Sequence, residues 1–226
     1  MSQRLLTSTF FISTFRCKYK SEHKDAHVWR ITKMPDFRVP VEDYKFLFRH
    51  VFKMDENYSK LNCDNDFSLD LLDTILDEAA KFSENELAPL YQSGDEEGCV
   101  LEDGVVTTPK GFKEAYSKFI EGGWTSLTGD VELGGQGLPS SVSLVVNEML
   151  TTANWAWAMY PGLSEGAVAT LESHGTDAQK NDYLPRLIDG RWRGTMCLTE
   201  PHCGTDLGQM KTNAKPVSYT HLTLPT

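Results

Sequence analysis

The segment MCLTEPHCGTDLG, residues 196–208, holds the densest group of reactive side chains in the sequence. It carries two cysteines, one histidine and two acids around Pro201 and Gly204. Three kinds of site use such a set of residues: a metal centre, a cysteine nucleophile, or a loop that holds a cofactor.

A metal centre here would use Cys197, His202 and Cys203, because thiolates and imidazoles are the ligands that zinc prefers. In structural zinc sites, however, ligands stand about two to four residues apart and a second pair follows elsewhere. No second cysteine pair accompanies these residues. We therefore predict that the segment binds no metal.

A cysteine nucleophile at Cys197 or Cys203 would need a nearby base and a lowered thiol pKa. His202 adjoins Cys203, but consecutive side chains of an extended chain point to opposite faces, so we expect these two not to meet. Cys197 is predicted to be a small buried residue on a strand. A further motif, GQGLPS at residues 135–140, begins like a dinucleotide-binding turn, but it lacks the third glycine and a preceding strand pattern.

The remaining interpretation is a cofactor loop. Trp192 and Thr195–Thr199 are predicted to be extended, and Pro201 excludes helix at Glu200. The turn that follows, Gly204-Thr205-Asp206, can present hydroxyl and backbone N–H groups beside a glycine that a ligand can approach closely. A flavin and its pyrophosphate are rich in acceptors and suit such a turn. An ordinary strand and turn is the alternative.

Amphipathic helices are predicted to precede and position this loop, because apolar residues recur at steps of three and four. Loops are expected at Ser93–Thr107 and over the glycine-rich residues 122–139. The fold class is therefore mainly α: a helical domain, followed from about residue 192 by the start of a β domain. The expected helices are one after Pro40, one over about 72–89, one from Thr108-Pro109 to Gly122, and three over 142–153, 163–174 (after a turn at Pro161-Gly162) and 177–188, the last capped by Thr176.

Charge and composition exclude several classes of protein. The net charge is −10, and because residues 1–33 hold seven Lys/Arg against two acids, the remaining chain carries −15. That body should repel nucleic acid and anionic membranes. Five cysteines, an odd number, do not form a disulfide framework, which favours a reducing compartment. The apolar runs fall far short of the roughly 20 residues that span a bilayer.

The basic extension, residues 1–33, has two interpretations. Met1–Lys20 has basic residues, several Ser/Thr and no acid, which is typical of a mitochondrial targeting segment. Alternatively it is upstream sequence translated in error, because MPDFRVP at Met34 resembles a natural start. The expected location is therefore the bacterial cytoplasm, or the mitochondrial matrix if the extension is genuine. Residues 34–66 are expected to form an extra helical segment before the main domain.

The segment resembles a motif of the acyl-CoA dehydrogenase family, Cys-x-Thr-Glu-Pro-x-x-Gly-Ser/Thr-Asp, found where that family's middle β domain begins. The glycine-rich residues 123–137 and YLPRLIDGRWRGTMCLTEP, residues 183–201, extend the resemblance to about residues 34–216. The variant EPHCGTDLG and the segment at 34–52 look most like the long-subunit branch that includes 3-methylmercaptopropionyl-CoA dehydrogenases. The broader family often has small residues where this chain has His202 and Cys203. The motif positions that match are Cys197, Thr199, Glu200, Pro201, Gly204, Thr205 and Asp206.

The resemblance implies a helical N-terminal domain at residues 67–191, the start of a β domain at 192–216, and α,β-dehydrogenation of an acyl-CoA thioester with FAD. Electrons would pass to an electron-transfer flavoprotein, and the full-length enzyme would be a homo-oligomer. Carried over by position, Gly204 and Thr205 would lie by the FAD pyrophosphate and the acyl-CoA. Glu200 would be a turn residue and not the catalytic base. The residues that would border the flavin ring, with Thr199 hydrogen-bonded to it, are Met196, Cys197, Leu198 and Thr199.

The family's catalytic glutamate lies in a C-terminal helical domain that the resemblance does not reach. The last ten residues, VSYTHLTLPT (217–226), abandon the family pattern and back-translate to a transposon-type sequencing adapter. We therefore expect a truncated gene product that is inactive alone. Alternatives with the same fold are an acyl-CoA oxidase or a flavin monooxygenase. An alternative of another class is a non-catalytic helical interaction module.

Overall fold

The computed structural model describes residues 36–60, 67–213, 215–216 and 222–223 of the 226-residue chain. The basic extension at 1–33, the polar residues 62–66 and most of the tail at 217–226 lie outside the described residues. No helix in the described ranges is long and apolar enough to cross a membrane.

Helices form most of the described chain. The α-helices are α1 (Val41–Phe46), α2 (Met54–Lys60), α3 (Leu69–Phe82), α4 (Leu90–Glu97), α5 (Phe112–Glu121), α6 (Ser140–Ala153), α7 (Trp155–His174) and α8 (Asp177–Ile188). The π-helical turns are η1 (Leu47–Val51) and η2 (Ser83–Leu87), and the 3₁₀ turns are η3 (Trp124–Ser126), η4 (Val131–Leu133) and η5 (Leu207–Gln209). Two antiparallel pairs of strands are formed by β1 (Val100–Glu102) with β2 (Val105–Thr107), and by β3 (Lys215–Pro216) with β4 (Leu222–Thr223).

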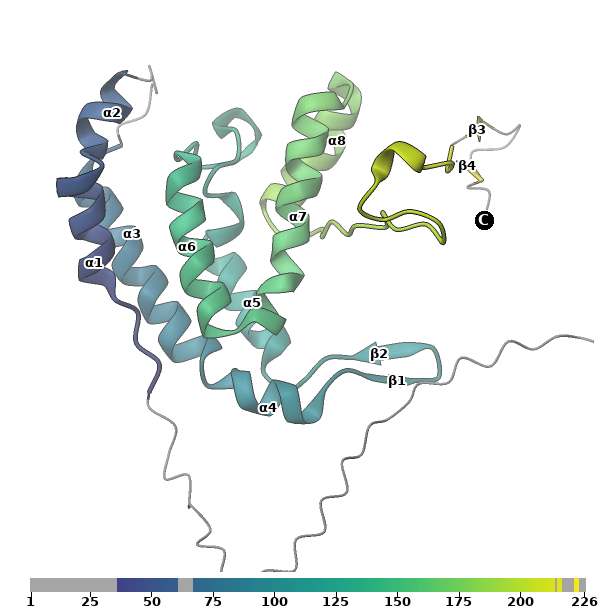
Figure 1. Cartoon of the computed structure of the whole chain (residues 1–226), viewed down its shortest axis with the longest axis horizontal. Coiled ribbons are helices and arrows are strands. Elements are labelled where there is room, and N and C mark those ends of the chain that lie inside the picture. Colours follow the sequence, from purple (N-terminus) through teal and green to yellow (C-terminus); the bar gives the residue numbers. More distant parts are fainter. Residues whose placement is uncertain (1–35, 61–66, 214, 217–221, 224–226) are drawn as a thin grey trace, which may run out of the picture. The chain divides into compact units, whose positions relative to one another are not determined.

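The helices pack next to one another around an apolar core. Helix α1 contacts α3, α3 contacts α6, α6 contacts α7 and α7 contacts α8, as Figure 1 shows. Apolar residues of α3, α5, α6 and α7 are buried in this core, so the expected mainly α fold class is confirmed. The large side chains that are fully buried include Leu72, Leu76, Leu87, Val142, Met149, Trp157, Leu184 and Ile188.

Several predicted helices are confirmed with close boundaries. Helix α6 covers the predicted residues 142–153, and a short helix follows Pro40. Helix α8 begins after Thr176, whose hydroxyl accepts a hydrogen bond from the Gln179 N–H at 3.3 Å. The Gln179 side chain accepts in return from the Thr176 N–H at 2.9 Å. The sequence identifies Thr176 as the cap because capping is a local pattern, and the structure adds Gln179 as its reciprocal partner in a capping box.

Two predictions fail at proline residues. Helix α5 begins at Phe112 and not at Pro109, because Gly111 has φ 83° and a left-handed residue cannot be part of the first helical turn. The predicted turn at Pro161 is also wrong, since α7 runs through it from Trp155 to His174. Pro161 is itself buried, and packing of this helix face offsets the backbone hydrogen bond that proline cannot make.

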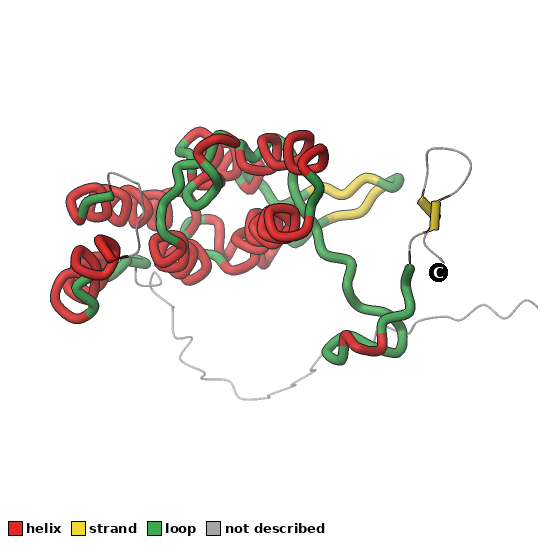
Figure 2. Tube along the Cα trace, turned by 90° about the horizontal axis from the view of Figure 1, so that it is seen from above, coloured by secondary structure: helices red, strands yellow, loops and turns green. Residues whose placement is uncertain are grey.

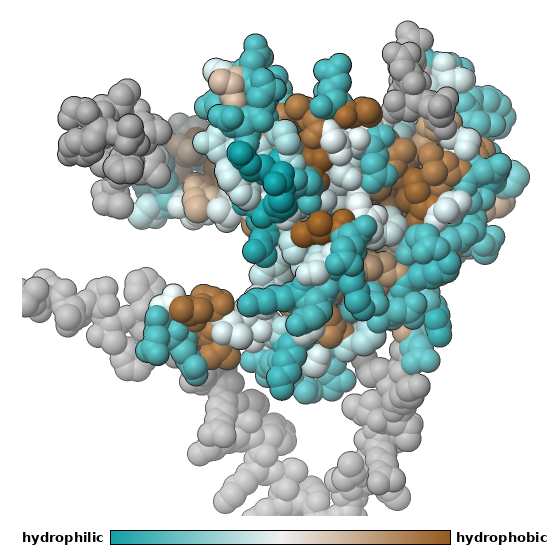
Figure 3. All heavy atoms as spheres, turned by 180° about the vertical axis from the view of Figure 1, so that it is seen from behind, coloured by the Kyte–Doolittle hydropathy of each residue, from teal (hydrophilic) through white to brown (hydrophobic). Residues whose placement is uncertain are grey.

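The predicted loop at Ser93–Thr107 is wrong as well. Its first residues belong to α4, and its last form the hairpin β1–β2, which turns at Asp103 and Gly104. Figure 3 shows that hydrophobic side chains are exposed between hydrophilic ones on the face that it draws. The hairpin is one source of exposed apolar surface, with Leu101 exposed to 68% and Val105 to 65%.

Two buried side chains, Asn154 and Trp157, join three parts of the helical core. Asn154 lies between α6 and α7, and its Oδ1 accepts from the Trp157 N–H at 3.0 Å. Its Nδ2 donates to the Leu87 carbonyl at 3.2 Å. The Trp157 indole N–H donates to the Phe112 carbonyl at 3.1 Å. The start of α7 is therefore fixed to the end of η2 and to the start of α5.

Replacing Asn154 tests this junction. Asn154→Ala removes a helix cap and leaves the Leu87 carbonyl buried without its donor, so the free energy of unfolding should fall by about 2 kcal/mol. Asn154→Ser keeps a capping oxygen and should lose about half as much. Urea denaturation of the purified variants measures both values. Equal stability of Asn154→Ala and the parent protein would contradict the role of this residue.

Candidate functional site

The chain beyond α8 leaves the helical core as irregular backbone, drawn mostly as loop in Figure 2. Residues 195–199 were predicted to form the first strand of a β domain, but within the described ranges they belong to no strand. A strand exists only when a neighbour accepts and donates its ladder hydrogen bonds. The stretch is therefore irregular chain that no strand ladder holds.

The start of this stretch is fixed to the helices. The Gly194 N–H donates to the buried Ser164 hydroxyl on α7 at 3.0 Å. A Cβ at Gly194 would lie 2.5 Å from the Ala167 Cβ, a distance too short for any side chain to be present. The Arg193 guanidinium lies over the Tyr116 ring of α5, 5.1 Å from its centroid, which is a cation–π contact.

The predicted flavin-facing residues are accessible. Met196 is exposed to 63%. Cys197 and Thr199 are exposed and Leu198 is half-buried, so the prediction that Cys197 is buried on a strand is wrong. Without a neighbouring strand or a second layer, nothing in the described chain covers the Cys197 side chain.

The structure brings Thr199 and Gly204 together. The chain reverses between Glu200 and Cys203, whose backbones exchange two hydrogen bonds of 2.8 and 3.2 Å. A Cβ built on Gly204 would lie 3.4 Å from Thr199 Cγ2 and 3.7 Å from its hydroxyl oxygen. Thr205, which follows, is exposed. Predicted residues from both sides of the turn therefore share one accessible surface.

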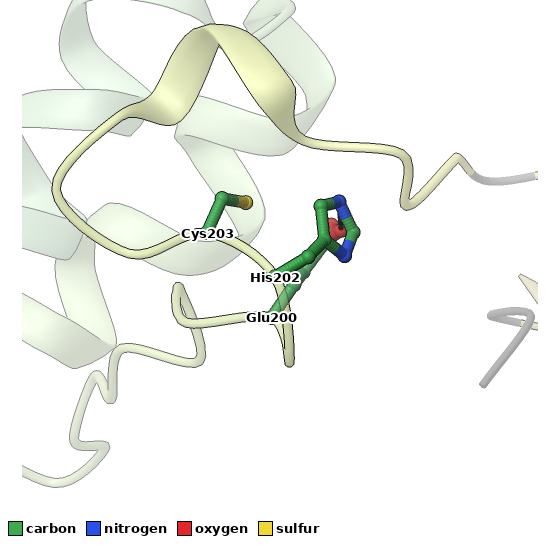
Figure 4. Close-up of side chains that lie close together, drawn as sticks. All are labelled: Glu200, His202 and Cys203. Atoms are coloured by element: carbon green, nitrogen blue, oxygen red, sulfur yellow. Dashed lines mark ion pairs between the residues drawn. The ribbon is translucent and has the colours of Figure 1, made fainter.

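The same turn gathers Glu200, His202 and Cys203, whose ligand-type atoms all lie within 4.8 Å of one another (Figure 4). The expectation that His202 and Cys203 do not meet assumed an extended chain, whereas the backbone turns at these residues. The hydrogen bond described for His202 is with the Gln209 carbonyl, and its ion pair is with Glu200. Sequence spacing did not identify Glu200 as the third member of the group.

Hydrogen bonds occupy the Glu200 carboxylate. It accepts from the backbone N–H groups of Lys211 at 3.0 Å and Thr212 at 2.9 Å, and it lies 3.4 Å from His202 Nε2. Bonds from Thr212, first of all, and from Lys211 lower the pKa of Glu200 to about 2. Glu200 is therefore ionised at neutral pH, and its role in the geometry is to close a loop.

The closed loop contains two glycines and one 3₁₀ turn. It runs from Cys203 to Met210 and includes Gly204, Gly208 and η5. Inside it, the Gln209 side-chain amide donates to Asp206 at 2.6 Å. Such a loop can offer backbone N–H groups and a hydroxyl to an anionic ligand.

Comparison with known proteins gives a consistent family match. Residues 71–191 match the family model described as "Acyl-CoA dehydrogenase, N-terminal domain". The chain is 39% identical over 180 residues to the 3-methylmercaptopropionyl-CoA dehydrogenase of Ruegeria pomeroyi, a match that covers 80% of this chain and 30% of the relative. It is 29% identical over 182 residues to a butyryl-CoA dehydrogenase of Syntrophomonas wolfei, covering 78% of this chain and 29% of that protein.

Solved structures agree with these relatives. The butyryl-CoA dehydrogenase of Megasphaera elsdenii aligns with a TM-score of 0.57 at 25% identity, covering 71% of this chain and 40% of that one. An acyl-CoA dehydrogenase of Bacillus anthracis, solved in complex with FAD, aligns with a TM-score of 0.52 at 25% identity, covering 66% of this chain and 24% of that one. The chain thus spans about 30% of the length of the first curated relatives it matches.

The hydrogen bonds from the Lys211 and Thr212 N–H groups to the Glu200 carboxylate, here called the Glu200 clasp, should weaken in acid. Because the pKa of Glu200 is lowered to about 2 from its ordinary value of 4.5, its contribution to loop closure is complete above pH 4.5 and is lost as the pH falls through about 2. Hydrogen-exchange protection of the Lys211 and Thr212 amides should follow this course. In Glu200→Gln, protection at pH 6 should fall about tenfold. Protection that is the same in both proteins would contradict the clasp.

Proposed function

Because the chain belongs to the acyl-CoA dehydrogenase family, we propose that it contributes the flavin-facing loop of an FAD-dependent enzyme that oxidises an acyl-CoA thioester at its α and β carbons. The observation that carries the proposal is the shared accessible surface of Thr199 and Gly204, next to a stretch fixed to α7 at Gly194. By family, the activity is that of an oxidoreductase.

The donor set fits FAD. A flavin ring has one edge of alternating hydrogen-bond donors and acceptors and two flat faces, and its pyrophosphate is anionic. Residues 196–199 offer backbone groups that are part of no strand in the described chain, together with the Thr199 hydroxyl. Gly204 has no side chain to keep a ligand at a distance. When bound, FAD supplies the acceptor for the hydride.

Each residue has a proposed role in binding. Thr199 donates its hydroxyl to the flavin ring, while Met196, Cys197 and Leu198 border the ring. Gly204 and Thr205 meet the pyrophosphate and the acyl-CoA through backbone N–H and hydroxyl groups. Two predicted site residues are thereby adjacent in space as well as in sequence pattern.

We assign the proton-abstracting base to none of the described carboxylates. Glu200, the acid in the site, has its oxygens occupied by backbone N–H groups and a lowered pKa of about 2. A base for a carbon acid works best with a pKa near the operating pH. We therefore propose that this chain alone does not turn over substrate. We further propose that the complete enzyme is a homo-oligomer and passes its electrons to an electron-transfer flavoprotein.

Substitutions at Thr199 and Gly204 test the proposal in a complete enzyme. The 180 residues that match the Ruegeria pomeroyi relative are replaced in that enzyme by those of this chain. Thr199→Ala should weaken FAD binding about fivefold, the value of one hydrogen bond, while Thr199→Ser should bind as the parent chimera does. Flavin fluorescence during dilution measures the dissociation constant. An unchanged constant in Thr199→Ala would contradict the assignment.

Gly204→Ala separates ligand approach from folding. The added Cβ makes only an ordinary contact of 3.4 Å with Thr199, so the melting temperature of the FAD-free protein should be unchanged. FAD affinity should fall at least about tenfold, because the methyl group stands where the ligand approaches. Affinity equal to that of the parent would contradict the role of Gly204.

Reaction with oxygen distinguishes the other enzymes of this fold. The substrate-reduced chimera should react slowly with oxygen and rapidly with electron-transfer flavoprotein. Rapid formation of hydrogen peroxide in stopped-flow spectra would instead favour an acyl-CoA oxidase. Failure of every variant and of the parent chimera to bind FAD would favour a non-catalytic module.

A further inference from the structure

His202 makes a second link across the cofactor loop. Its Nε2 lies 3.0 Å from the Gln209 carbonyl oxygen and 3.4 Å from a Glu200 carboxylate oxygen. The first link is the Glu200 carboxylate itself, which holds the Lys211 and Thr212 backbone. Both links enclose the segment that carries Gly204 and Thr205.

The partners of His202 determine where its proton lies. A carbonyl oxygen and a carboxylate oxygen are both acceptors, so Nε2 must carry the hydrogen that is shared with them. The other ring nitrogen, Nδ1, keeps its lone pair. The Glu200 carboxylate oxygens accept the backbone N–H groups of Lys211 and Thr212. Glu200 and His202, which Figure 4 shows side by side, are therefore both hydrogen-bonded to the backbone of the segment that follows them.

We propose that His202 is a positioning residue that closes the loop from Cys203 to Gln209 by donating Nε2–H to the Gln209 carbonyl, and so holds Gly204 and Thr205 ready for the cofactor. This inference rests on the proposed function for the identity of the ligand, but the closure itself does not. A loop with glycines at 204 and 208 loses much conformational freedom when it is ordered. A link that orders the loop before binding removes that cost from the binding step.

Limited proteolysis of the full chain without cofactor tests the closure. Trypsin cleaves after Lys211, whose own N–H and that of Thr212 are held by the clasp. Cleavage after the exposed Lys110 gives an internal reference. His202→Ala should be cut at Lys211 about fivefold faster than the parent, relative to Lys110, because one hydrogen bond is lost.

Matched variants separate the hydrogen bond from the bulk of the ring. In His202→Gln the side-chain amide occupies the place of Nε2 and should restore the parent rate, whereas in His202→Asn it occupies the place of Nδ1 and should not. Gln209→Ala keeps the accepting carbonyl and removes only the side-chain bond to Asp206, so it should be cut at the parent rate. Equal rates in His202→Ala and the parent, or equal rates in His202→Gln and His202→Ala, would overturn the proposal.

A spectroscopic measurement gives an independent outcome. Nitrogen-15 spectra of the imidazole at pH 8 should show the Nε2–H tautomer in the parent protein, since Nε2 is hydrogen-bonded to the Gln209 carbonyl, which can only accept. The Nδ1–H tautomer would overturn the proposal even if the protease rates agreed with it.

Cofactor affinity then separates this inference from the proposed function. In the chimera, His202→Ala should weaken FAD binding about fivefold and His202→Gln should restore it. If the protease and tautomer results hold but the parent chimera binds no FAD, the proposed function fails and the closure stands. If the parent binds FAD and His202→Ala binds it equally well, the positioning role is overturned while the proposed function stands.

Discussion

The chain leaves its helical domain through a contact that admits no side chain at residue 194. A Cβ on Gly194 would lie 2.5 Å from the Ala167 Cβ and 3.2 Å from the Leu163 carbonyl oxygen, both on α7. The Gly194 N–H is bonded at that place to the Ser164 hydroxyl, which is buried in the same helix. Because this contact fixes residue 194 on α7, the exposed site residues that follow begin from a defined point of the helical core.

The loop beyond that contact is held by hydrogen bonds to an ionised carboxylate, and not by the backbone hydrogen bonds of a β-sheet. In the described part of the chain, residues 195–199 have no neighbouring strand. The loop is closed instead by the Glu200 carboxylate, which accepts from the backbone of Lys211 and Thr212, and by His202, which donates to Gln209. Hydrogen bonds to an ionised acceptor are stronger than neutral ones, so a few contacts order a segment with little apolar burial. The acids that could attract a metal or a proton are thus used to shape the site.

The sequence predicts those parts of the fold that depend on local patterns. The period of α6 and the helix cap at Thr176 are read within a few residues, and both are confirmed. The turn predicted at Pro161 is wrong, because α7 continues through this proline. The helix accommodates Pro161 through its burial in the fold, which the neighbouring residues in the sequence do not indicate. The hairpin β1–β2 was hidden because its strands have three residues each and no buried face.

In the site too, the sequence predicts the features that depend on local patterns and misses those that depend on tertiary contacts. The motif identified Thr199 and Gly204, and the structure places them close together. It gave no sign that His202 reaches Gln209 or that Glu200 reaches Lys211 and Thr212, since these pairs meet only after the turn at 200–203 has formed. Cys197 was predicted to be buried because cysteine side chains are usually found in protein interiors. Burial requires a covering layer, and the described chain supplies none at this position.

Hydrogen–deuterium exchange of the chimera with and without FAD tests the central claim most directly, because it locates the cofactor on the chain. We predict that FAD slows exchange in residues 196–206 and leaves the hairpin β1–β2 unchanged. Slower exchange that is confined to other segments, with residues 196–206 unaffected, would contradict the assignment of this loop to the flavin.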